Sequence, residues 1–548
     1  MTPRDLPRAR SRPSRRTPGA LLLLALLPAG ILLLPGPARA DEWGLGAVRD
    51  PFATPTEQDR FPGLALDGYL RLRSDVLTNL DLDRGPTPST GETFYPLPAS
   101  DPGGKDTLTS GNLRLRLEPR LDLGWELSVH ARLDLLDGLV LGSTPDLATR
   151  WAALNAAATR QQAPADSLVV KQAWGQALTP FGLLLAGRLG VGWGLGVVAN
   201  DGSCLDCDGG DTVDGLLFAV PVLQHSLGLA YGLSATGARF DPWGGGGQAV
   251  DADPDDDVRS LSLSLLRTAT PAVREVLRAG GRSVLDHGLV VADRWQDVDD
   301  PGATGEAGLA PTAATRVARG FSGVLVDGFL AFAGPTHLLE LELVLLSASF
   351  DDASLLAGMR TDPVTARQYG GVVRETIRPR AGLELGLELG LASGDPAPGF
   401  GARPRTTQDR ARAGDLDGPQ LALPEDRRID NLRFSPDYHV DLILWRELVG
   451  TITDALYLRP RVQLGPWRGF TLELVGIYSQ AMEATSAPAA EAPLGFETDL
   501  ALRYASPDGL VCGLQYGLLF PLAGLDNREL GLDARPAQRL HGLLGWVV

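Results

Sequence analysis

The sequence predicts an all-β protein, a transmembrane antiparallel β-barrel of about 18 strands (16–20) with short periplasmic turns and long extracellular loops. Two observations lead to this class. In residues 113–134 nearly every odd position is apolar and most even positions are charged, and similar alternation recurs along most of the 548-residue chain. Along the chain, short connections between these segments alternate with long ones. Period-2 alternation indicates strands, and strict parity of connection length is typical of outer-membrane barrels.

The N-terminus has the features of a targeting segment. Arginines at 4–16 precede an apolar stretch at 20–34 and the small-residue motif Ala38-Arg39-Ala40. This order indicates a secretory signal peptide. We therefore predict a signal peptide at 1–40, a periplasmic N-terminal segment at 41–62 and an outer-membrane barrel at 63–548.

The strands follow in order along the chain. The alternating segments lie at 64–76, 113–134 (a hairpin), 167–178, 182–190, 226–235, 259–267, 287–297, 321–332, 337–347, 382–393, 456–464, 470–480, 498–506, 509–520 and 539–548, and flanking turns define the others. Counting 437–448 as a strand would break the parity of the connections. If residues 437–448 instead lie inside a long loop from about 394 to 451, about 18 strands remain, which is an even number. The i, i+4, i+8 apolar positions of this segment predict a helix or plug near 437–448, and 270–280 also fits a helix.

The two faces of the strands distinguish a barrel from a soluble sandwich, which also alternates. Here Leu dominates the apolar face, while Gly and Ser fill much of the other. The hydrocarbon of a bilayer accepts Leu side chains that do not interlock with their neighbours. The exported chain also shows no other membrane anchor. We expect the protein in the cell outer membrane, with outer-membrane lipid, lipopolysaccharide and the barrel assembly machinery as partners. Two aromatic girdles are predicted at the rims, with ordinary packing as the alternative reading: Trp125, Trp174 and Trp467 near short turns, and Trp193, Trp243 and Trp295 near long loops.

The charged face of the strands supplies candidates for lining the lumen of the barrel. They are Arg71, Arg73, Arg114, Arg116, Arg188, Arg459, Arg461, Arg503, Glu340, Glu384 and Glu388. Both signs are present, so charge indicates no clear selectivity for cations or anions. The alternative is that these charges only solvate the inner wall.

The segment 200–211, NDGSCLDCDGGD, is the densest polar cluster. Asp201, Asp206, Asp208 and Asp211 could give a calcium ion several oxygen ligands, although EF-hand spacing is missing. Cys204 and Cys207 are close in sequence in an exported loop, which favours a disulfide between them. Apart from this candidate calcium site we expect no cofactor.

Composition and motifs exclude other classes of function. The formal net charge is -17, which argues against nucleic acid as a partner. The six histidines are scattered, and no nucleophile elbow, P-loop or zincin motif is found. We therefore expect no enzymatic activity.

Four stretches carry a resemblance to a known family: 129–145, 179–215, 393–401 and 431–460. They resemble an uncharacterised family of outer-membrane β-barrel proteins found mainly in myxobacteria and their relatives. The resemblance implies an outer-membrane location and adds no activity. Such barrels usually end in an aromatic residue, whereas this chain ends Trp546-Val547-Val548.

Two hypotheses of function remain open. The first is a porin-like channel for passive passage of small solutes, with loops folded partly into the lumen. The alternative is a structural or surface-binding barrel that residues 394–451 plug.

Overall fold

The computed structural model describes residues 63–88, 91, 106–124, 126–141, 168–234, 239–240, 250–251, 254–269, 271–299, 316–353, 363–400, 412–416 and 426–548. The predicted signal peptide at 1–40 and the segment at 41–62 lie outside these residues.

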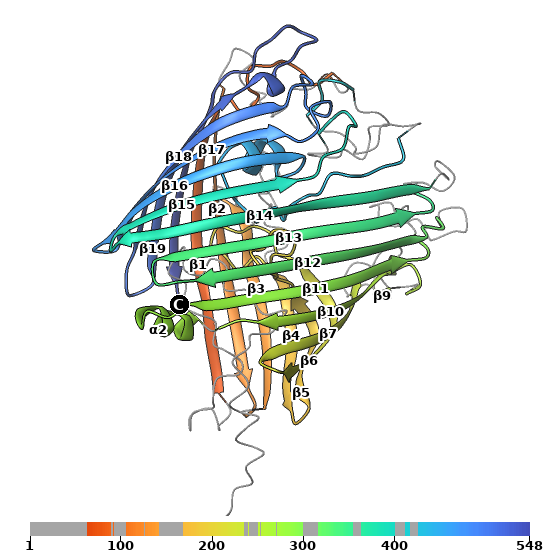
Figure 1. The fold of residues 1–548 in the computed structure, drawn as a ribbon, viewed down its shortest axis with the longest axis vertical. Helices are drawn as coiled ribbons and strands as arrows, with labels where there is room; N and C mark the ends of the chain where they lie inside the picture. Colours follow the sequence, from red (N-terminus) through yellow and green to blue (C-terminus); the bar gives the residue numbers. More distant parts are fainter. Residues whose placement is uncertain are drawn as a thin grey trace, which may run out of the picture.

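Eighteen antiparallel strands form one closed wall (Figure 1). Each strand pairs with its neighbours in the chain, and β1 pairs with both β2 and β20, which closes the ring. The predicted barrel and its strand count are confirmed. The wall strands are β1 (Gly63–Thr78), β2 (Thr107–Asp122), β3 (Leu127–Val140), β4 (Val169–Thr179), β5 (Gly182–Gly190), β6 (Thr212–Val222), β7 (His225–Ser234), β10 (Val258–Arg267), β11 (Val284–Gln296), β12 (Phe321–Ala333), β13 (His337–Phe350), β14 (Val364–Arg380), β15 (Leu383–Ala392), β16 (Ala455–Trp467), β17 (Phe470–Ala481), β18 (Pro493–Ala505), β19 (Leu510–Pro521) and β20 (Ala537–Val547).

Short elements occupy some of the connections. The helix α2 (Pro271–Ala279) joins β10 to β11 on the short-turn side, as the sequence predicts. The ribbon β8 (Arg239–Phe240) and β9 (Val250–Asp251) lies between β7 and β10. The 3₁₀ turn η6 (Ala523–Leu525) follows β19. Among the described residues, no helix has the length and apolarity needed to cross a membrane.

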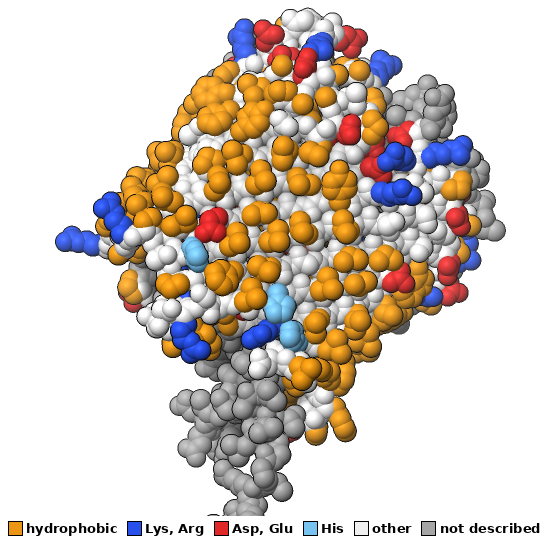
Figure 2. Space-filling view, in the orientation of Figure 1, with side chains coloured by type: hydrophobic (Ala, Val, Ile, Leu, Met, Phe, Trp, Pro, Cys, Tyr) orange, Lys and Arg blue, Asp and Glu red, His pale blue; other side chains and the backbone are white. Residues whose placement is uncertain are grey.

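The outer face of the wall is apolar. Leu227 and Leu229 of β7, Leu263 of β10, and Leu343 and Leu345 of β13 all point outward and are exposed. Figure 2 shows such hydrophobic side chains spread over one side of the wall, with charged side chains mostly near its borders. In hydrocarbon every backbone N–H and C=O needs an internal partner, and a closed ladder supplies one. This architecture is that of an outer-membrane β-barrel.

Two segments between strands fold into the lumen. The first, residues 191–211 between β5 and β6, is called the strap. The second, residues 426–454 between β15 and β16, is called the insert; it contains the single-turn π-helix η5 (Leu444–Val449). As predicted, residues 437–448 form no strand and lie within a loop. Side chains of the insert, among them Trp445 and Leu448, form a buried apolar core inside the barrel.

The tryptophans only partly follow the predicted girdles. Trp467 is 53 % exposed on the wall. Trp193 instead lies inside the barrel on the strap, edge-on to Phe329 at 5.4 Å between ring centroids. Trp174 stacks on His130 at 4.7 Å, and these two residues are register partners of β3 and β4. A girdle is therefore wrong for Trp193, because the long loop that carries it turns inward. Trp125 and Trp243 lie outside the described residues.

Candidate channel lumen

Strand alternation points a row of arginines into the lumen. Arg71 and Arg73 of β1, Arg114 and Arg116 of β2, and Arg132 of β3 are each at most 6 % exposed. We call these five residues the arginine wall. A buried guanidinium needs acceptors for its N–H groups, so its neighbours show what fills this side of the barrel.

The strap supplies backbone carbonyls to the arginine wall. Arg71 Nη1 donates to the carbonyl oxygens of Leu205 at 3.0 Å and Cys207 at 3.1 Å. Arg114 Nη1 also donates to the carbonyl of Cys207, at 2.7 Å. The same arrangement continues along the wall, where Arg116 donates to the carbonyl of Gly202 and Arg132 to that of Asp201. These contacts fix the path of the strap backbone across three strands.

Two strap carboxylates add ion pairs to these contacts. Asp208 lies 2.7 Å from Arg73 Nη2 and 3.3 Å from Arg71 Nη2. Asp206 lies 3.2 Å from Arg73 Nη1 and 2.8 Å from Arg446 Nη1 of the insert. Burial by itself raises the pKa of a carboxyl, but the surrounding cations outweigh it and hold the pKa of Asp206 and Asp208 well below its ordinary value. Both carboxylates are therefore ionised at neutral pH.

The other end of the strap binds the opposite side of the barrel. Glu342 of β13 is fully buried and accepts hydrogen bonds from the backbone N–H groups of Leu195 and, at 3.2 Å, Val197. In the ring order, β13 stands nine strands from β2, half of the 18-stranded circle. The strap therefore crosses the lumen from wall to wall.

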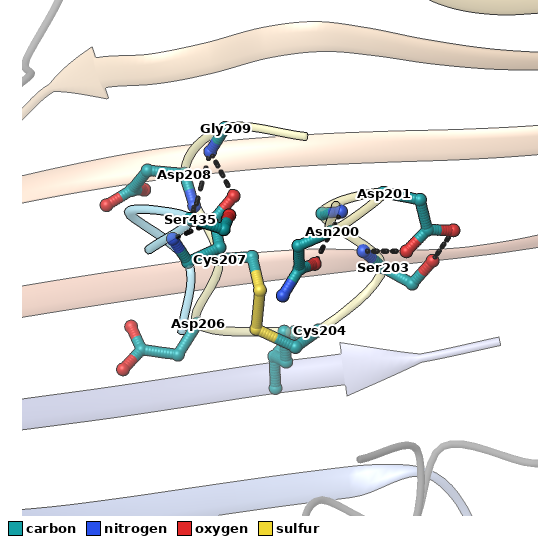
Figure 3. The surroundings of a disulfide bond; sticks show 12 residues. Asn200, Asp201, Ser203, Cys204, Asp206, Cys207, Asp208, Gly209 and Ser435 are labelled. Carbon is teal, nitrogen blue, oxygen red and sulfur yellow. Dashed lines mark hydrogen bonds between the residues drawn. A yellow bond between two sulfur atoms is a disulfide. The ribbon is translucent and has the colours of Figure 1, made fainter. Parts of the chain in front are cut away.

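A disulfide closes the middle of the strap (Figure 3). Cys204 and Cys207 are bonded, as the sequence predicts, with their Cα atoms 5.1 Å apart. Leu205, between them, is fully buried against Tyr69, Val511 and Leu543 of the wall. Gly202 has φ +68°, and a Cβ there would lie 2.5 Å from the carbonyl oxygen of Gly209, so only glycine fits this turn without strain.

The predicted calcium site does not form around the four aspartates. Figure 3 shows the carboxylates of Asp206 and Asp208 on the opposite side of the strap from that of Asp201. Asp201 accepts from Ser203, and Asp211 accepts from the N–H of Asn200. Within the described part of the chain, no group of three or more His, Cys, Asp or Glu residues could hold a metal ion. Arginines pair with Asp206 and Asp208, and Asp201 and Asp211 bind neighbouring strap residues, so the four carboxylates do not form the predicted site.

Several backbone N–H groups of the insert bind buried carboxylates. Glu497 of β18 accepts from Leu442, Ile443 and Leu444 at 3.0, 2.8 and 3.0 Å. Asp441 accepts from the N–H groups of Trp445 and Arg446 at the start of η5. Burial and then the nearby Glu497 raise the pKa of Asp441 well above its ordinary value.

The strap and the insert also bind each other. Asp437 accepts hydrogen bonds from the N–H groups of Asp208, at 2.8 Å, and Gly209, at 3.0 Å to the nearer oxygen. The N–H of Ser435 donates to the carbonyl of Val197 at 2.6 Å. The two segments therefore form one assembly within the lumen.

A polar cavity of about 70 Å³ remains beside this assembly. Its lining combines Asp206 of the strap and Asp441 and Arg446 of the insert with wall residues that include Arg459 and Glu473. The cavity is large enough for several water molecules. Both signs of charge line it.

The structure places ten of the eleven predicted lumen residues on the inner face. Arg71, Arg73, Arg114 and Arg116 bind the strap, whereas Arg459, Arg461, Arg503, Glu340, Glu384 and Glu388 form ion pairs with other wall residues. Arg188 is the exception. It alternates with the buried Leu185 and Leu189, is 48 % exposed and pairs with Asp214 on the outer face at 2.7 Å. The prediction for Arg188 is wrong because the strand parity of β5 turns it outward.

Sequence reasoning missed several residues that organise the lumen. Asp437, Asp441 and Arg446 lie on the insert, and Glu497 and Arg539 lie on strands. The inner-face alternation of Glu497 and Arg539 is a signal that could have found them. No such signal exists for the insert, because its contacts depend on how a loop folds back.

Comparisons with known proteins find neither a family model nor a curated protein that matches the chain by sequence. Several solved porins are similar in fold. OccAB4 of Acinetobacter baumannii has a TM-score of 0.44 at 10 % identity, over 90 % of this chain and 99 % of that one. OccK8 (OprE) of Pseudomonas aeruginosa has a TM-score of 0.42 at 11 % identity, over 88 % and 98 %. A BenF-like porin of Pseudomonas fluorescens Pf-5 has a TM-score of 0.43 at 10 % identity, over 88 % and 98 %. Similarities at this level identify no family for the chain.

Proposed function

We propose that the protein is a porin-like outer-membrane channel for passive passage of small polar solutes, narrowed by the strap and the insert. The observation that carries this proposal is the wall-to-wall course of the strap between Glu342 and the arginine wall. An 18-stranded ring is wide enough for an aqueous channel unless segments fill it. The strap and the insert partly fill this ring, and a polar cavity remains between them and the wall.

The lining of the cavity supports small polar solutes without a preferred charge. Cationic and anionic side chains both line it, and some of them are paired with each other, such as Arg503 with Glu473 at 2.8 Å. Passage in such a pore depends on pore size and on the charges of its lining. No catalytic step is part of the proposal.

Single-channel conductance in a planar bilayer tests the proposal. We expect the full chain to conduct in discrete but small steps. A variant that lacks residues 201–209 should conduct in steps that are several-fold larger, because both the disulfide loop and its ion pairs leave the lumen. The matched control is Arg188→Ala on the outer face, which should leave the step size unchanged. Absence of conductance from both the full chain and the strap deletion contradicts the proposal.

A plugged structural barrel is the second candidate. The observation that favours it is the apolar core of the insert, in which Ile443, Trp445 and Leu448 are each at most 2 % exposed. A segment packed this well can act as a permanent plug. In that case the full chain stays silent, and conductance begins only when residues 430–450 are deleted.

A further inference from the structure

Two histidines meet on the outer face of the wall, away from the lumen. His225 begins β7 and His287 lies near the start of β11, so both stand at the short-turn rim. Their Nε2 atoms share a hydrogen bond at 3.1 Å, and the ring planes make an angle of 63°. Figure 2 shows two histidine side chains grouped with a basic side chain near the edge of the apolar surface.

The separation of the two nitrogens matches that of two ligands on one metal ion. Zinc binds histidine nitrogen at 2.0–2.1 Å with tetrahedral angles, which puts two such nitrogens about 3.3 Å apart. His225 and His287 reach this spacing from two strands that β10 separates, so only the convergence of the two side chains brings the nitrogens together.

His225 Nε2 directs its lone pair toward His287, where it accepts a hydrogen bond from Nε2 of that ring, and a bound metal ion would take the place of the shared proton. The Nδ1 of His225 lies 3.0 Å from the carbonyl oxygen of Leu223, so the proton sits on Nδ1. A backbone carbonyl that accepts the other ring N–H is the usual support of a metal-binding histidine. Imidazole nitrogen suits Zn²⁺ and Cu²⁺, and Cu²⁺ binds such ligands most tightly.

We propose that His225 and His287 bind one divalent transition-metal ion, Zn²⁺ or Cu²⁺, through their Nε2 atoms, with water completing the coordination. This site is separate from the lumen and does not depend on the channel function. Two charged residues lie close to it. Arg267 is in register with His287 and limits the affinity for a cation, whereas Asp286 points inward and pairs with Arg274 at 2.5 Å.

Metal binding to the full chain in detergent micelles tests the proposal, with ZnCl₂ and CuCl₂ as titrants in calorimetry. We expect one ion per chain. His225→Ala and His287→Ala should each weaken binding on the order of tenfold or more, since even the loss of a supporting group costs a metal site 10–100-fold. His337→Ala is the matched control, because His337 begins β13 at the same rim and contacts Phe332. Heat-modifiable migration on gels confirms that each variant remains a folded barrel.

Arg267→Ala separates this proposal from anion binding by the same cluster. Removing the positive charge should tighten metal binding about a few-fold, since like charges repel over this distance. A phosphate site would show the reverse, with inorganic phosphate bound by the full chain and lost from Arg267→Ala. The proposal is overturned if either histidine variant binds metal as the full chain does, if His337→Ala loses as much affinity, or if Arg267→Ala binds metal more weakly.

The Cu²⁺ complex supplies a readout beyond affinity. Its electron paramagnetic resonance spectrum should show splitting from two nitrogen ligands in the full chain and in His337→Ala, and from one in each of the other histidine variants. A spectrum without nitrogen splitting in the full chain contradicts the assignment.

Discussion

The strap meets the arginine wall through its oxygens, whereas the insert meets the buried carboxylate of Glu497 through its N–H groups. Arg71 and Arg114 hold strap carbonyls, while Glu497 holds three consecutive N–H groups of the insert. The two segments also differ in polarity, because the insert has an extended apolar core, whereas the strap combines buried apolar residues such as Trp193 and Leu205 with ion pairs. One barrel can therefore hold inward loops through either the carbonyl or the N–H groups of the backbone, provided that alternation places the matching charge on its inner face.

The largest effect is expected in the apolar core of the insert. Trp445→Ala removes a side chain that is 2 % exposed and whose Nε1 donates to Ser479 at 2.9 Å. The cavity left behind should lower the free energy of unfolding by about 3–5 kcal/mol, and the loosened insert should enlarge the conductance steps. Urea titration followed by gel migration measures the first effect. An unchanged midpoint would show that the insert does not contribute to the stability of the barrel.

A somewhat smaller effect is expected at the ion pairs of the strap. Asp208→Asn leaves Arg71, Arg73 and Arg114 without the carboxylate that faces all three. Removing one partner of a buried pair should lower the free energy of unfolding by about 3 kcal/mol. The same urea titration measures this loss of unfolding free energy. The conductance steps should also become larger, because the strap loosens. If Asp208→Asn is as stable as the full chain, the strap is held by its carbonyl contacts alone.

The two segments should respond differently to pH. Burial raises the pKa of Asp454, at the end of the insert, to about 6, whereas the pKa of Asp206 and Asp208 is lowered. A raised folded pKa contributes stability that is complete below the unfolded value of 3.8 and is lost as the pH rises through about 6. A lowered folded pKa contributes stability above 3.8 that is lost only as the pH falls through the lower folded values.

Acidification from pH 7.5 to pH 5 should therefore stabilise the insert and leave the strap unchanged. Urea midpoints measured across this window check the expectation. Asp454→Asn is the control and should reduce the gain between these two pH values, whereas the part that comes from the raised pKa of Asp441 should remain. A gain as large in Asp454→Asn as in the full chain would show that Asp454 does not contribute to the effect.

The smallest effect is expected on the outer face. Arg188→Ala removes an ion pair with Asp214 in which both side chains are about half exposed. Exposed pairs contribute about 0–1 kcal/mol, so the urea midpoint should barely move. The contrast with Asp208→Asn isolates burial as the reason that an arginine–aspartate pair matters in this barrel. If Arg188→Ala lowers the free energy of unfolding as much as Asp208→Asn does, burial is not what distinguishes the two ion pairs.

The strand count and the inner residues could largely be predicted from the sequence. Arg71, Arg114, Glu388 and Arg461 are inside because their apolar neighbours point outward, and side chains on a strand alternate between two faces. Arg188 escaped this reasoning because the inner face of β5 is apolar where the strap covers it, with Leu185 and Leu189 packed beneath Trp193. Where a loop lies against the wall, a charged residue in a strand therefore does not by itself identify the face that points into the lumen.

The strap itself could be predicted only in part. The proximity of Cys204 and Cys207 indicated the disulfide, because such short spacing allows the bond in an exported loop. The aspartates beside them suggested calcium, since several carboxylates in a short segment resemble a cation site. The structure instead sets Asp206 and Asp208 against arginines that lie more than 90 residues away in the sequence. No local sequence pattern predicts a contact between residues so far apart in the chain.

The closed wall, its 18 strands and the faces of most of their side chains follow from the sequence, because period-2 alternation and the parity of connections are local properties of the chain. The contents of the lumen follow only from contacts between distant parts of the chain. The path of the strap from Glu342 to the arginine wall, the packing of the insert and the meeting of His225 with His287 all join residues far apart in sequence. Such contacts depend on the geometry of the closed ring, which brings strands to opposite or converging positions that no short window of sequence contains.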